Sequence, residues 1–479
     1  MKYSVIIRHI GLIIAIVGLA MLAPVHISLI NREPYVPVWI GIAAATTVLG
    51  LVLFLAVRVR ETIGYREGFA MVTFAWVAAT LFGALPFWMT GAIPGFADAF
   101  FESMSGFSTT GASILTDIES LPRSLLFWRS LTHWLGGMGI MVLFVALLSQ
   151  LGAGGMQVFR AEAPGPITEK IKPRISETAK ILWLTYVILT LAETLLLRIA
   201  GLDWFDSLTH TFGTMATGGF STKNLSVGAF QNPAVEWIII VFMFAAGTNF
   251  ALYYTAVKKK SLKNFWHNEE FKLYTSITLG AILIIWLILA AEHGFFKAAR
   301  LASFQVVSII TTTGYATDDY VLWPSMATGV LFLLMFVGGS AGSTGGGMKV
   351  SRYLVLLKHS GLQLKKFFHP RAVFSLKVGG KSYPEDIIIS IFQFFFFYIF
   401  MVITGTVIMT GFGLEIKSAV SAVLATLGNI GPGFGAVGPM ENYAFLPDAA
   451  KYLLSFFMLV GRLEIFTVLV LLLPSFWRK

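Results

Sequence analysis

The chain lacks cysteine altogether, and charged residues make up only 13% of its 479 residues. Without cysteine there is no disulfide, no thiolate metal site and no thiol redox switch. A soluble globular chain is about one quarter charged, whereas 56% of this chain is hydrophobic and its mean hydropathy is +0.77. The composition therefore predicts an all-α integral membrane protein that crosses the bilayer several times.

Signs of an enzyme or of a nucleic-acid-binding protein are also scarce. The 8 histidines form no H-E-x-x-H motif, and no cluster of acidic residues and histidines suggests a catalytic centre. No G-x-G-x-x-G unit stands between a strand and a helix, and no soluble domain is visible, so the chain has no nucleotide site or organic cofactor of its own. The net charge of +10 is explained by basic cytoplasmic loops rather than by nucleic acid.

Long apolar runs predict ten membrane spans, since about 20 apolar residues cross a bilayer as a helix. Two spans come first, near 10–30 and 37–57; the first is too long for a signal peptide and lacks a clear cleavage site, so we interpret it as a retained helix. Then a pattern of span, short half-apolar segment, glycine-containing stretch and second span occurs four times. The predicted divisions are an N-terminal pair of helices at 1–67 and four units at 68–175, 176–268, 269–382 and 383–479.

The four glycine-containing stretches resemble one another and lie about 100 residues apart, which indicates an internal repeat. Each unit holds two full spans, so all four have the same orientation and are related by an axis along the membrane normal. Four such units in one chain enclose one pseudo-fourfold pathway. The residues predicted to line it are Thr109, Thr110 and Gly111; Ala216, Thr217 and Gly218; Thr312, Thr313 and Gly314; and Asn429, Ile430 and Gly431.

The segments before these stretches, at 97–108, 204–215, 300–311 and 417–428, are too short to cross the membrane. We expect re-entrant half-helices whose C-terminal ends present partial negative charge at mid-membrane. Irregular backbone at that depth must line a cavity, where backbone carbonyls can replace the hydration shell of an ion. No copy carries a carboxylate, so the chemistry favours a monovalent cation. For one copy alone, a helix-end glycine with threonines bonded to nearby carbonyls is the plainer interpretation.

Charge in the loops predicts the orientation. One side collects Lys and Arg, including Lys258–Lys260 and Lys365-Lys366, and is therefore cytoplasmic. The opposite side collects acids, which form either an ordinary solvated surface or a vestibule that concentrates cations. These acids are Asp98, Glu102, Asp117, Glu119, Asp203, Asp206, Glu236, Asp318, Asp319, Glu441 and Asp448.

Five segments carry a resemblance to a known family: 105–113, 133–139, 216–222, 338–347 and Gly461-Arg462. Over nearly its whole length the chain resembles the TrkH branch of the Trk/Ktr/HKT superfamily of potassium transporters. The resemblance implies helix–pore-helix–helix units around one pathway in the bacterial inner membrane, potassium or sodium as permeant ion, a homodimer, and a cytosolic ring of RCK-type nucleotide-binding regulatory subunits. The fourth copy departs most from the family pattern.

Two features lie beyond the repeated stretches. Gly338, Gly339, Ser340, Ala341, Gly342, Ser343, Thr344, Gly345, Gly346 and Gly347 interrupt an apolar run. Glycine costs about 1 kcal/mol in a helix interior, so the helix should break into a loop that gates the pathway; close helix packing is the alternative. Arg462 lies in an apolar run and must face a cavity or a partner. It is either a positive charge on the pathway or a salt bridge to Glu193 or Glu292.

These patterns predict potassium uptake through a channel-like pore with a four-part filter. A sodium- or proton-coupled cation symporter is the alternative, because coupling leaves no signature in this sequence. Membrane lipids are the other partner that the basic loops imply.

Overall fold

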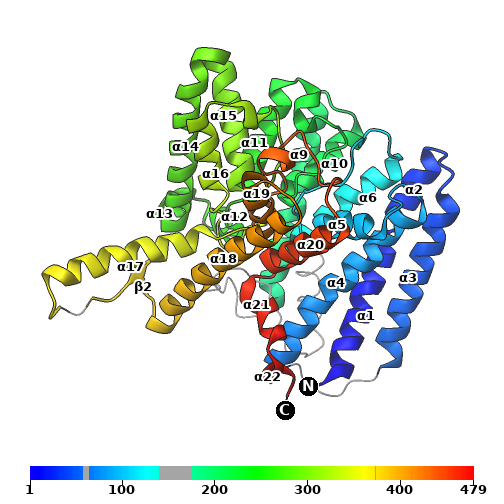
Figure 1. Ribbon diagram of the computed structural model, residues 1–479, viewed down its shortest axis with the longest axis horizontal. Helices are drawn as coiled ribbons and strands as arrows, with labels where there is room; N and C mark the ends of the chain where they lie inside the picture. The colour runs from blue at the N-terminus through cyan, green and yellow to red at the C-terminus, as the bar shows by residue number, and fades with distance from the viewer. Residues whose placement is uncertain (58–63, 140–174, 373, 479) are drawn as a thin grey trace.

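The computed structural model describes residues 1–57, 64–139, 175–372 and 374–478, and helices dominate all of these ranges (Figure 1). The strands within them form one small hairpin of β1 (Lys377–Val378) and β2 (Lys381–Ser382). The prediction of an all-α membrane protein is confirmed. The basic segment 140–174, which the sequence assigns to the end of unit one and its cytoplasmic loop, lies outside the described residues.

The helices before and within the first two units have the following bounds. The N-terminal group is α1 (Tyr3–Ala20), α2 (Leu22–Ile30) and α3 (Val36–Ala56). Unit one contains α4 (Tyr65–Met89), α5 (Phe96–Phe107), α6 (Arg123–Trp134) and the π-helical turn η1 (Leu135–Gly139). Unit two contains α9 (Ile175–Ile199), α10 (Trp204–Met215), η2 (Ser226–Phe230), α11 (Pro233–Ala246) and α12 (Phe250–Lys259).

The last two units follow the same order. Unit three contains α14 (Glu269–His293), α15 (Phe295–Ile310), η3 (Tyr320–Leu322), α16 (Ser325–Leu334) and α17 (Val350–Phe368), preceded by the short α13 (Lys263–His267). Unit four contains α18 (Glu385–Gly411), α19 (Ile416–Leu427), η4 (Gly435–Val437), α20 (Asp448–Arg462), α21 (Ile465–Leu469), η5 (Val470–Leu472) and α22 (Pro474–Trp477).

Six helices in the described ranges are long and apolar enough to cross a membrane, and up to eight spans result if each bent helix pair is one span. The first of them, Tyr3–Ile30, packs along α3 through small residues: a Cβ atom on Gly50 would lie 2.3 Å from the backbone nitrogen of Ala15. Two of the ten predicted spans are not among these eight. The second span of unit one runs into the undescribed segment, and that of unit three is interrupted by its glycines.

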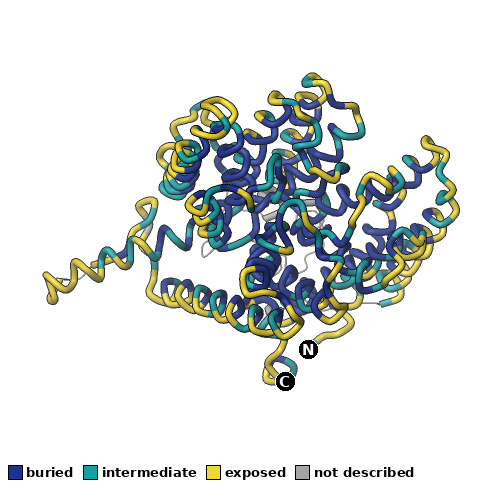
Figure 2. Tube along the Cα trace, turned by 45° about the horizontal axis from the view of Figure 1, so that its top comes forward, coloured by how far each residue is buried: buried dark blue, intermediate teal, exposed yellow. Residues whose placement is uncertain are grey.

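The short helices of the four units are α5, α10, α15 and α19. Figure 1 places α19 near the middle of the molecule, and Figure 2 shows buried backbone at the centre with exposed backbone around it. The four short helices begin and end within a few residues of the predicted half-helices, and almost every residue of their C-terminal halves is buried. The outer helices are buried on one side only. On α14, for example, Leu279, Leu283 and Leu287 are all exposed, as expected of a stripe that faces lipid.

Polar contacts join helices of neighbouring units. Each contact runs from the second helix of one unit to the short helix of the next. They are the ion pair between Glu236 on α11 and Arg300 on α15 (2.8 Å), the ion pair between Lys451 on α20 and Asp98 on α5 (2.5 Å), and the Arg123 guanidinium of α6 over the Phe205 ring of α10 (5.3 Å).

The second helices break in more places than the sequence predicts. The expected break in unit three is present, between α16 and α17. In addition, α11 and α12 meet at 92° across residues 247–249, and α20 and α21 meet at 119° beyond Arg462. Asn249 caps α12 by accepting from the backbone N–H of Ala251 at 2.9 Å, which stabilises a helix start in mid-membrane. The predicted second spans of units two and four are therefore each a pair of helices with a break between them.

Candidate ion-binding site

Each short helix ends in the same backbone conformation. After the last helical residue comes one residue in the right-handed region, then one non-glycine residue with positive φ, then another residue, then a glycine with positive φ. The left-handed residues are Thr109 (φ 55°), Thr217 (54°), Thr312 (61°) and Asn429 (52°), and the glycines are Gly111 (81°), Gly219 (78°), Gly314 (80°) and Gly431 (97°). A non-glycine residue in this region is uncommon, and four at equivalent positions indicate a functional backbone conformation.

The four stretches form a closed ring. A Cβ atom on each glycine would meet a carbonyl oxygen of the next stretch, so each glycine lies directly against its neighbour. The contacts are Gly111 with the oxygen of Gly218 (2.1 Å), Gly219 with that of Thr313 (2.0 Å), Gly314 with that of Ile430 (2.0 Å), and Gly431 with that of Thr110 (2.6 Å). We call the carbonyls of Thr110, Gly218, Thr313 and Ile430 the carbonyl ring. Any larger residue at these glycines displaces a carbonyl of the adjacent copy.

The ring corrects the alignment of the second copy. The sequence prediction aligned Gly218 with Gly111, but the structure aligns Gly219 with it, and Thr217 with Thr109. Gly218 instead supplies the ring carbonyl. Ala216 is the helix cap of α10 and precedes the irregular backbone. Two adjacent glycines made the choice ambiguous in the sequence, and only the sign of φ distinguishes them.

A polar side chain of each short helix holds the chain that follows its own glycine. In unit one Glu102 accepts from the Ser113 hydroxyl (3.0 Å) and the Ile114 N–H (3.0 Å). In unit two His210 Nε2 lies 2.9 Å from Ser221 Oγ. The other two contacts are Gln305 and Ser308 donating to the Tyr315 carbonyl (3.3 and 2.6 Å), and Ser421 Oγ accepting from the Phe434 N–H (2.9 Å). These braces fix the backbone that carries the ring.

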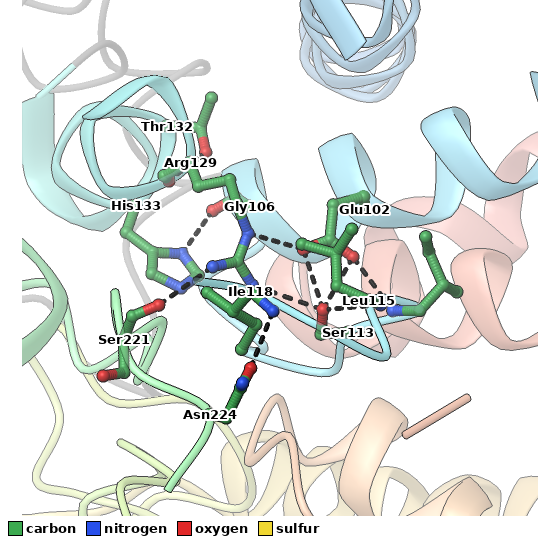
Figure 3. A network of polar contacts seen from close by, with 11 residues as sticks. Glu102, Gly106, Ser113, Leu115, Ile118, Arg129, Thr132, His133, Ser221 and Asn224 are labelled. Atoms are coloured by element: carbon green, nitrogen blue, oxygen red, sulfur yellow. Dashed lines mark hydrogen bonds and ion pairs between the residues drawn. The ribbon is translucent and has the colours of Figure 1, made fainter. Parts of the chain in front are cut away.

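Glu102 also forms a buried ion pair with Arg129 of α6 (Figure 3). Arg129 Nε donates to the carboxylate at 2.8 Å, while its Nη1 donates to the Ser221 carbonyl at 3.0 Å. The prediction that Glu102 belongs to an outer acidic surface is wrong, because the carboxylate is fully buried behind the first copy. Sequence reasoning missed Arg129; its available signal was a charge within the predicted second span of unit one.

His133, one turn further along α6, is hydrogen-bonded and packed. Its Nδ1 donates to the Gly106 carbonyl at 2.7 Å, and its ring stacks on Phe220 with centroids 4.1 Å apart. A Cβ atom on Gly218 would lie 2.5 Å from this ring. The imidazole therefore packs against the second glycine-containing stretch, at Gly218 and Phe220.

Exposed acids remain at the outer loops. Asp117 and Glu119 of unit one are exposed, and Asn224 of unit two joins both: it donates to Asp117 at 3.0 Å and its backbone N–H donates to Glu119 at 3.2 Å. The hydrogen bond from Asn224 lowers the pKa of the Asp117 carboxyl below its ordinary value. This carboxylate stays ionised in mildly acidic surroundings, which favours cations near the outer face. Glu236 and Asp98, in contrast, belong to the ion pairs described above.

The glycine-rich stretch 338–347 lies against the inner ends of the short helices. A Cβ atom on Gly346 would lie 2.6 Å from the Gly428 carbonyl, and the Gly346 N–H donates to the Thr312 hydroxyl at 2.6 Å. On its other side, Ser340 N–H donates to the Gly247 carbonyl at 2.9 Å, in the break between α11 and α12. The stretch is thus a loop next to the ring, and it is not a helix packed through small residues.

Arg462 binds this loop and the first copy together. Its Nη1 donates to the Thr344 carbonyl (2.9 Å) and the Thr109 hydroxyl (3.1 Å), and its Nη2 donates to the carbonyls of Gly136 (2.7 Å) and Gly137 (2.6 Å). The structure does not support the alternative that Arg462 forms a salt bridge to Glu193 or Glu292. Neither oxygen of Glu193 has a hydrogen-bond partner among the described residues, and Glu292 is exposed.

Lys349 is a second cation at the loop, and sequence reasoning missed it. It is buried, and its ammonium group donates to the Gly345 carbonyl. Nearby on α17, Arg352 pairs with Glu464, the residue with positive φ in the break between α20 and α21. Consecutive carbonyls of the loop, Thr344 and Gly345, are therefore each held by a cation. The signal in the sequence was a lysine two residues after the last loop glycine.

Known proteins are similar to this chain over its full length. A family model described as TrkH, cation transport protein, matches residues 37–479. The Trk system potassium uptake protein TrkH of Salmonella typhimurium is 41% identical across 100% of both chains, and that of Halomonas elongata is 40% identical, also across 100% of both. The crystal structure of the potassium transporter TrkH from Vibrio parahaemolyticus superposes with a TM-score of 0.89, at 37% identity and 100% coverage of both chains.

The apolar helices and these relatives together establish a multi-pass protein of the bacterial inner membrane. The family model covers far more than half of the sequence, and the relatives match it from end to end. The chain belongs to the TrkH family of cation transport proteins.

Proposed function

We propose that the chain takes up potassium through a channel-like pathway whose selective part is the carbonyl ring. The observation that carries this proposal is the closed ring of four glycine-to-carbonyl contacts at the ends of four buried helices. Carbonyl oxygens can replace the water around a cation, and the helix ends add partial negative charge. Threonines contribute hydroxyls without net charge, which suits a monovalent ion that must also leave. The relatives are named as potassium uptake proteins.

The proposed architecture is ten membrane-spanning helices arranged as two N-terminal helices (1–67) and four parallel units around a pseudo-fourfold axis. The units are 68–175, 176–268, 269–382 and 383–479. The order of long helix, short helix and irregular stretch recurs in all four units, and the second helix is broken in units two, three and four, which supports this division. The filter residues are those predicted above, with Gly219 added to the second copy.

The loop at 338–347 is the proposed gate. It lies against the ends of α15 and α19, and Arg462 and Lys349 hold two of its carbonyls. The second helix of unit two breaks beside the loop, where the Ser340 N–H donates to the Gly247 carbonyl, and that of unit four breaks just after Arg462, which donates to the Thr344 carbonyl. An ion that leaves the ring must displace this loop or pass beside it.

The chain acts as a transporter and not as an enzyme, and potassium is its cargo rather than a resident cofactor. We propose a homodimer that works with a cytosolic ring of RCK-type nucleotide-binding subunits. The relatives are named as parts of a Trk system, which supports association with further components. The basic helix ends at Lys258–Lys260 and Lys365-Lys366, which loop charge assigns to the cytoplasmic side, suit anionic lipid headgroups or such a partner.

Ion flux in liposomes tests the proposed function. The purified protein should carry potassium and rubidium well and sodium poorly, and an imposed proton gradient should change the flux only through the membrane potential. Empty liposomes under the same gradients are the control. Equal potassium and sodium flux would contradict the filter, and potassium accumulation against its electrochemical gradient, driven by protons or sodium, would favour the symporter alternative.

Replacing Arg462 with alanine should raise potassium flux several-fold. The variant removes a positive charge next to the pathway, which lowers the electrostatic barrier to a cation. It also releases the Thr344 carbonyl, so the loop at 338–347 is held less firmly. Rubidium uptake into liposomes measures the effect. An Arg462→Lys variant keeps the charge but not the planar fork that reaches four oxygens, and it should fall between alanine and wild type. A variant that folds and conducts no faster than wild type would show that Arg462 is structural only.

A further inference from the structure

The buried ion pair between Glu102 and Arg129 stands out among the four braces. Nine residues before the ring glycine, the short helices carry Glu102, His210, Gln305 and Ala422. Three of these residues are polar, but only Glu102 is a carboxylate with a cationic partner, and the two side chains are 0% and 1% exposed. We infer that this pair is a positioning element that fixes the carbonyl ring and thereby contributes to ion selection. The inference rests on the proposed function.

The pair contacts the backbone of two copies at once. Glu102 accepts from the Ser113 hydroxyl and the Ile114 N–H in the first copy. Arg129 donates to the same Ser113 hydroxyl at 3.3 Å and to the Ser221 carbonyl of the second copy at 3.0 Å. Its guanidinium also lies 4.0 Å from the centre of the Phe220 ring. The outer parts of copies one and two are therefore held at a set separation by one planar group.

The same contacts continue into the fourth copy. The Ser113 carbonyl accepts from the Tyr443 N–H at 2.8 Å, and the Tyr443 hydroxyl donates to the Gly431 carbonyl at 2.9 Å. The third copy has its own brace, in which the Tyr315 hydroxyl donates to the carbonyls of His210 and Phe220. Hydrogen bonds thus link the pair to the backbone of copies one, two and four.

Stability alone does not account for such a pair. A buried ion pair contributes little net stability, since burial removes both charges from water, and well-packed apolar residues often do as well. What an apolar pair cannot do is hydrogen-bond a serine hydroxyl, a backbone N–H and a carbonyl of another copy. The pair also brings no net charge, so it orients the backbone without attracting or repelling the ion on the pathway.

The geometry of Arg129 distinguishes orientation from charge. Lysine in its place would keep the charge opposite Glu102, but a compact ammonium group cannot hold the carboxylate, the Ser113 hydroxyl and the Ser221 carbonyl in one plane. Glutamine at both positions would remove both charges and, because its side chain is shorter than that of arginine, would also remove the planar guanidinium that joins Ser113 to Ser221. If the pair acts by orientation, both changes should loosen ion selection while the pathway stays open.

The experiment compares Arg129→Lys and the double variant Glu102→Gln with Arg129→Gln against wild type. The full-length protein is reconstituted in liposomes, and rubidium uptake is measured with increasing competing sodium. We expect rubidium uptake to persist and the preference over sodium to fall about tenfold, the change in a ratio of affinities that follows from ~1.4 kcal/mol. Thermal unfolding and size-exclusion profiles measure folding separately.

The matched control is the ion pair between Glu236 and Arg300, replaced by glutamine at both positions. It also joins two units through a charged contact of 2.8 Å, but neither residue touches a ring stretch in the described contacts. Its double variant should keep wild-type selectivity whatever it does to stability. If this control also loses selectivity, the effect at Arg129 is explained by general destabilisation of the protein, and the inference is overturned.

The remaining outcomes are also decisive. If the glutamine pair fails to fold, Arg129→Lys decides the matter. Wild-type selectivity in a folded Arg129→Lys protein would overturn the inference and leave the proposed function intact. A wild-type protein that shows no preference for rubidium over sodium would instead refute the proposed function itself.

Discussion

Replacing Gly314 with serine should lower the preference for potassium over sodium by about tenfold or more. Gly314 has φ +80°, and a Cβ atom there would lie 2.0 Å from the Ile430 carbonyl oxygen. The left-handed conformation costs a non-glycine residue roughly 1–2 kcal/mol, and relief of the clash must move a ring carbonyl. Rubidium uptake in liposomes with competing sodium measures the preference.

Gly294→Ser is the matched control for backbone strain. Gly294 lies in the same unit with φ +75°, but a side chain there meets open space, so this variant should keep wild-type selectivity. Gly111→Ser should behave as Gly314→Ser does, because its Cβ would lie 2.1 Å from the Gly218 carbonyl. Unchanged selectivity in folded Gly314→Ser protein would remove the carbonyl ring from ion selection.

The corrected alignment adds a comparison within the second copy. Gly219→Ala should disturb the ring as Gly314→Ser does, since its Cβ would lie 2.0 Å from the Thr313 carbonyl. Gly218→Ala meets the His133 side chain instead, and a side chain can shift more easily than a neighbouring strand. A larger loss of selectivity in Gly218→Ala would restore the alignment expected from the sequence.

Excision of residues 339–346 should raise potassium flux in the absence of any partner by about tenfold, the change expected when a barrier falls by ~1.4 kcal/mol. The excision is structurally feasible because the ends of the loop already meet. The Gly338 N–H donates to the Met348 carbonyl at 2.8 Å, and a Cβ atom on Gly338 would lie 3.1 Å from the carbonyl carbon of Gly347. Rubidium uptake by the purified variant measures the flux.

A variant with a loop of wild-type length in which Ala341 and Thr344 are replaced by glycine controls for steric occlusion, since the other six residues are already glycine or serine. It should conduct less than the excision variant. Selectivity should be retained in both, because the ring itself is unchanged apart from the loss of the Gly346 contact to Thr312. Flux at or below the wild-type rate in folded excision variant would show that the loop does not gate.

The positions of the short helices could be predicted because their sequence carries a local signal. The segment predicted at 204–215 coincides with α10 (Trp204–Met215), and α5 and α19 differ from their predicted segments by one residue at each end. Only α15 departs clearly, beginning at Phe295 rather than at 300. Helical apolar spacing followed by an irregular, glycine-containing stretch is readable without knowledge of the partners.

Partners from distant segments could not be predicted. Arg462 was recognisable as a charge in an apolar run, but the oxygens that it binds come from Thr109, Gly136, Gly137 and Thr344, as far as 353 residues away. Glu102 looked like one outer acid among many, because nothing near it in the chain shows that Arg129 of α6 will enclose it. Charge and hydropathy indicate whether a side chain needs a polar partner, but they do not identify the residue that provides it.

The sequence by itself determined the membrane class, the fourfold recurrence of a glycine-containing stretch, the break at 338–347 and the family. All of these depend on composition, period or local spacing. Only the tertiary structure decided that Gly219 rather than Gly218 faces the next copy, that the four stretches close into a ring, and that Glu102 is buried against Arg129. These depend on backbone angles and on contacts between units, which the packing of whole helices sets.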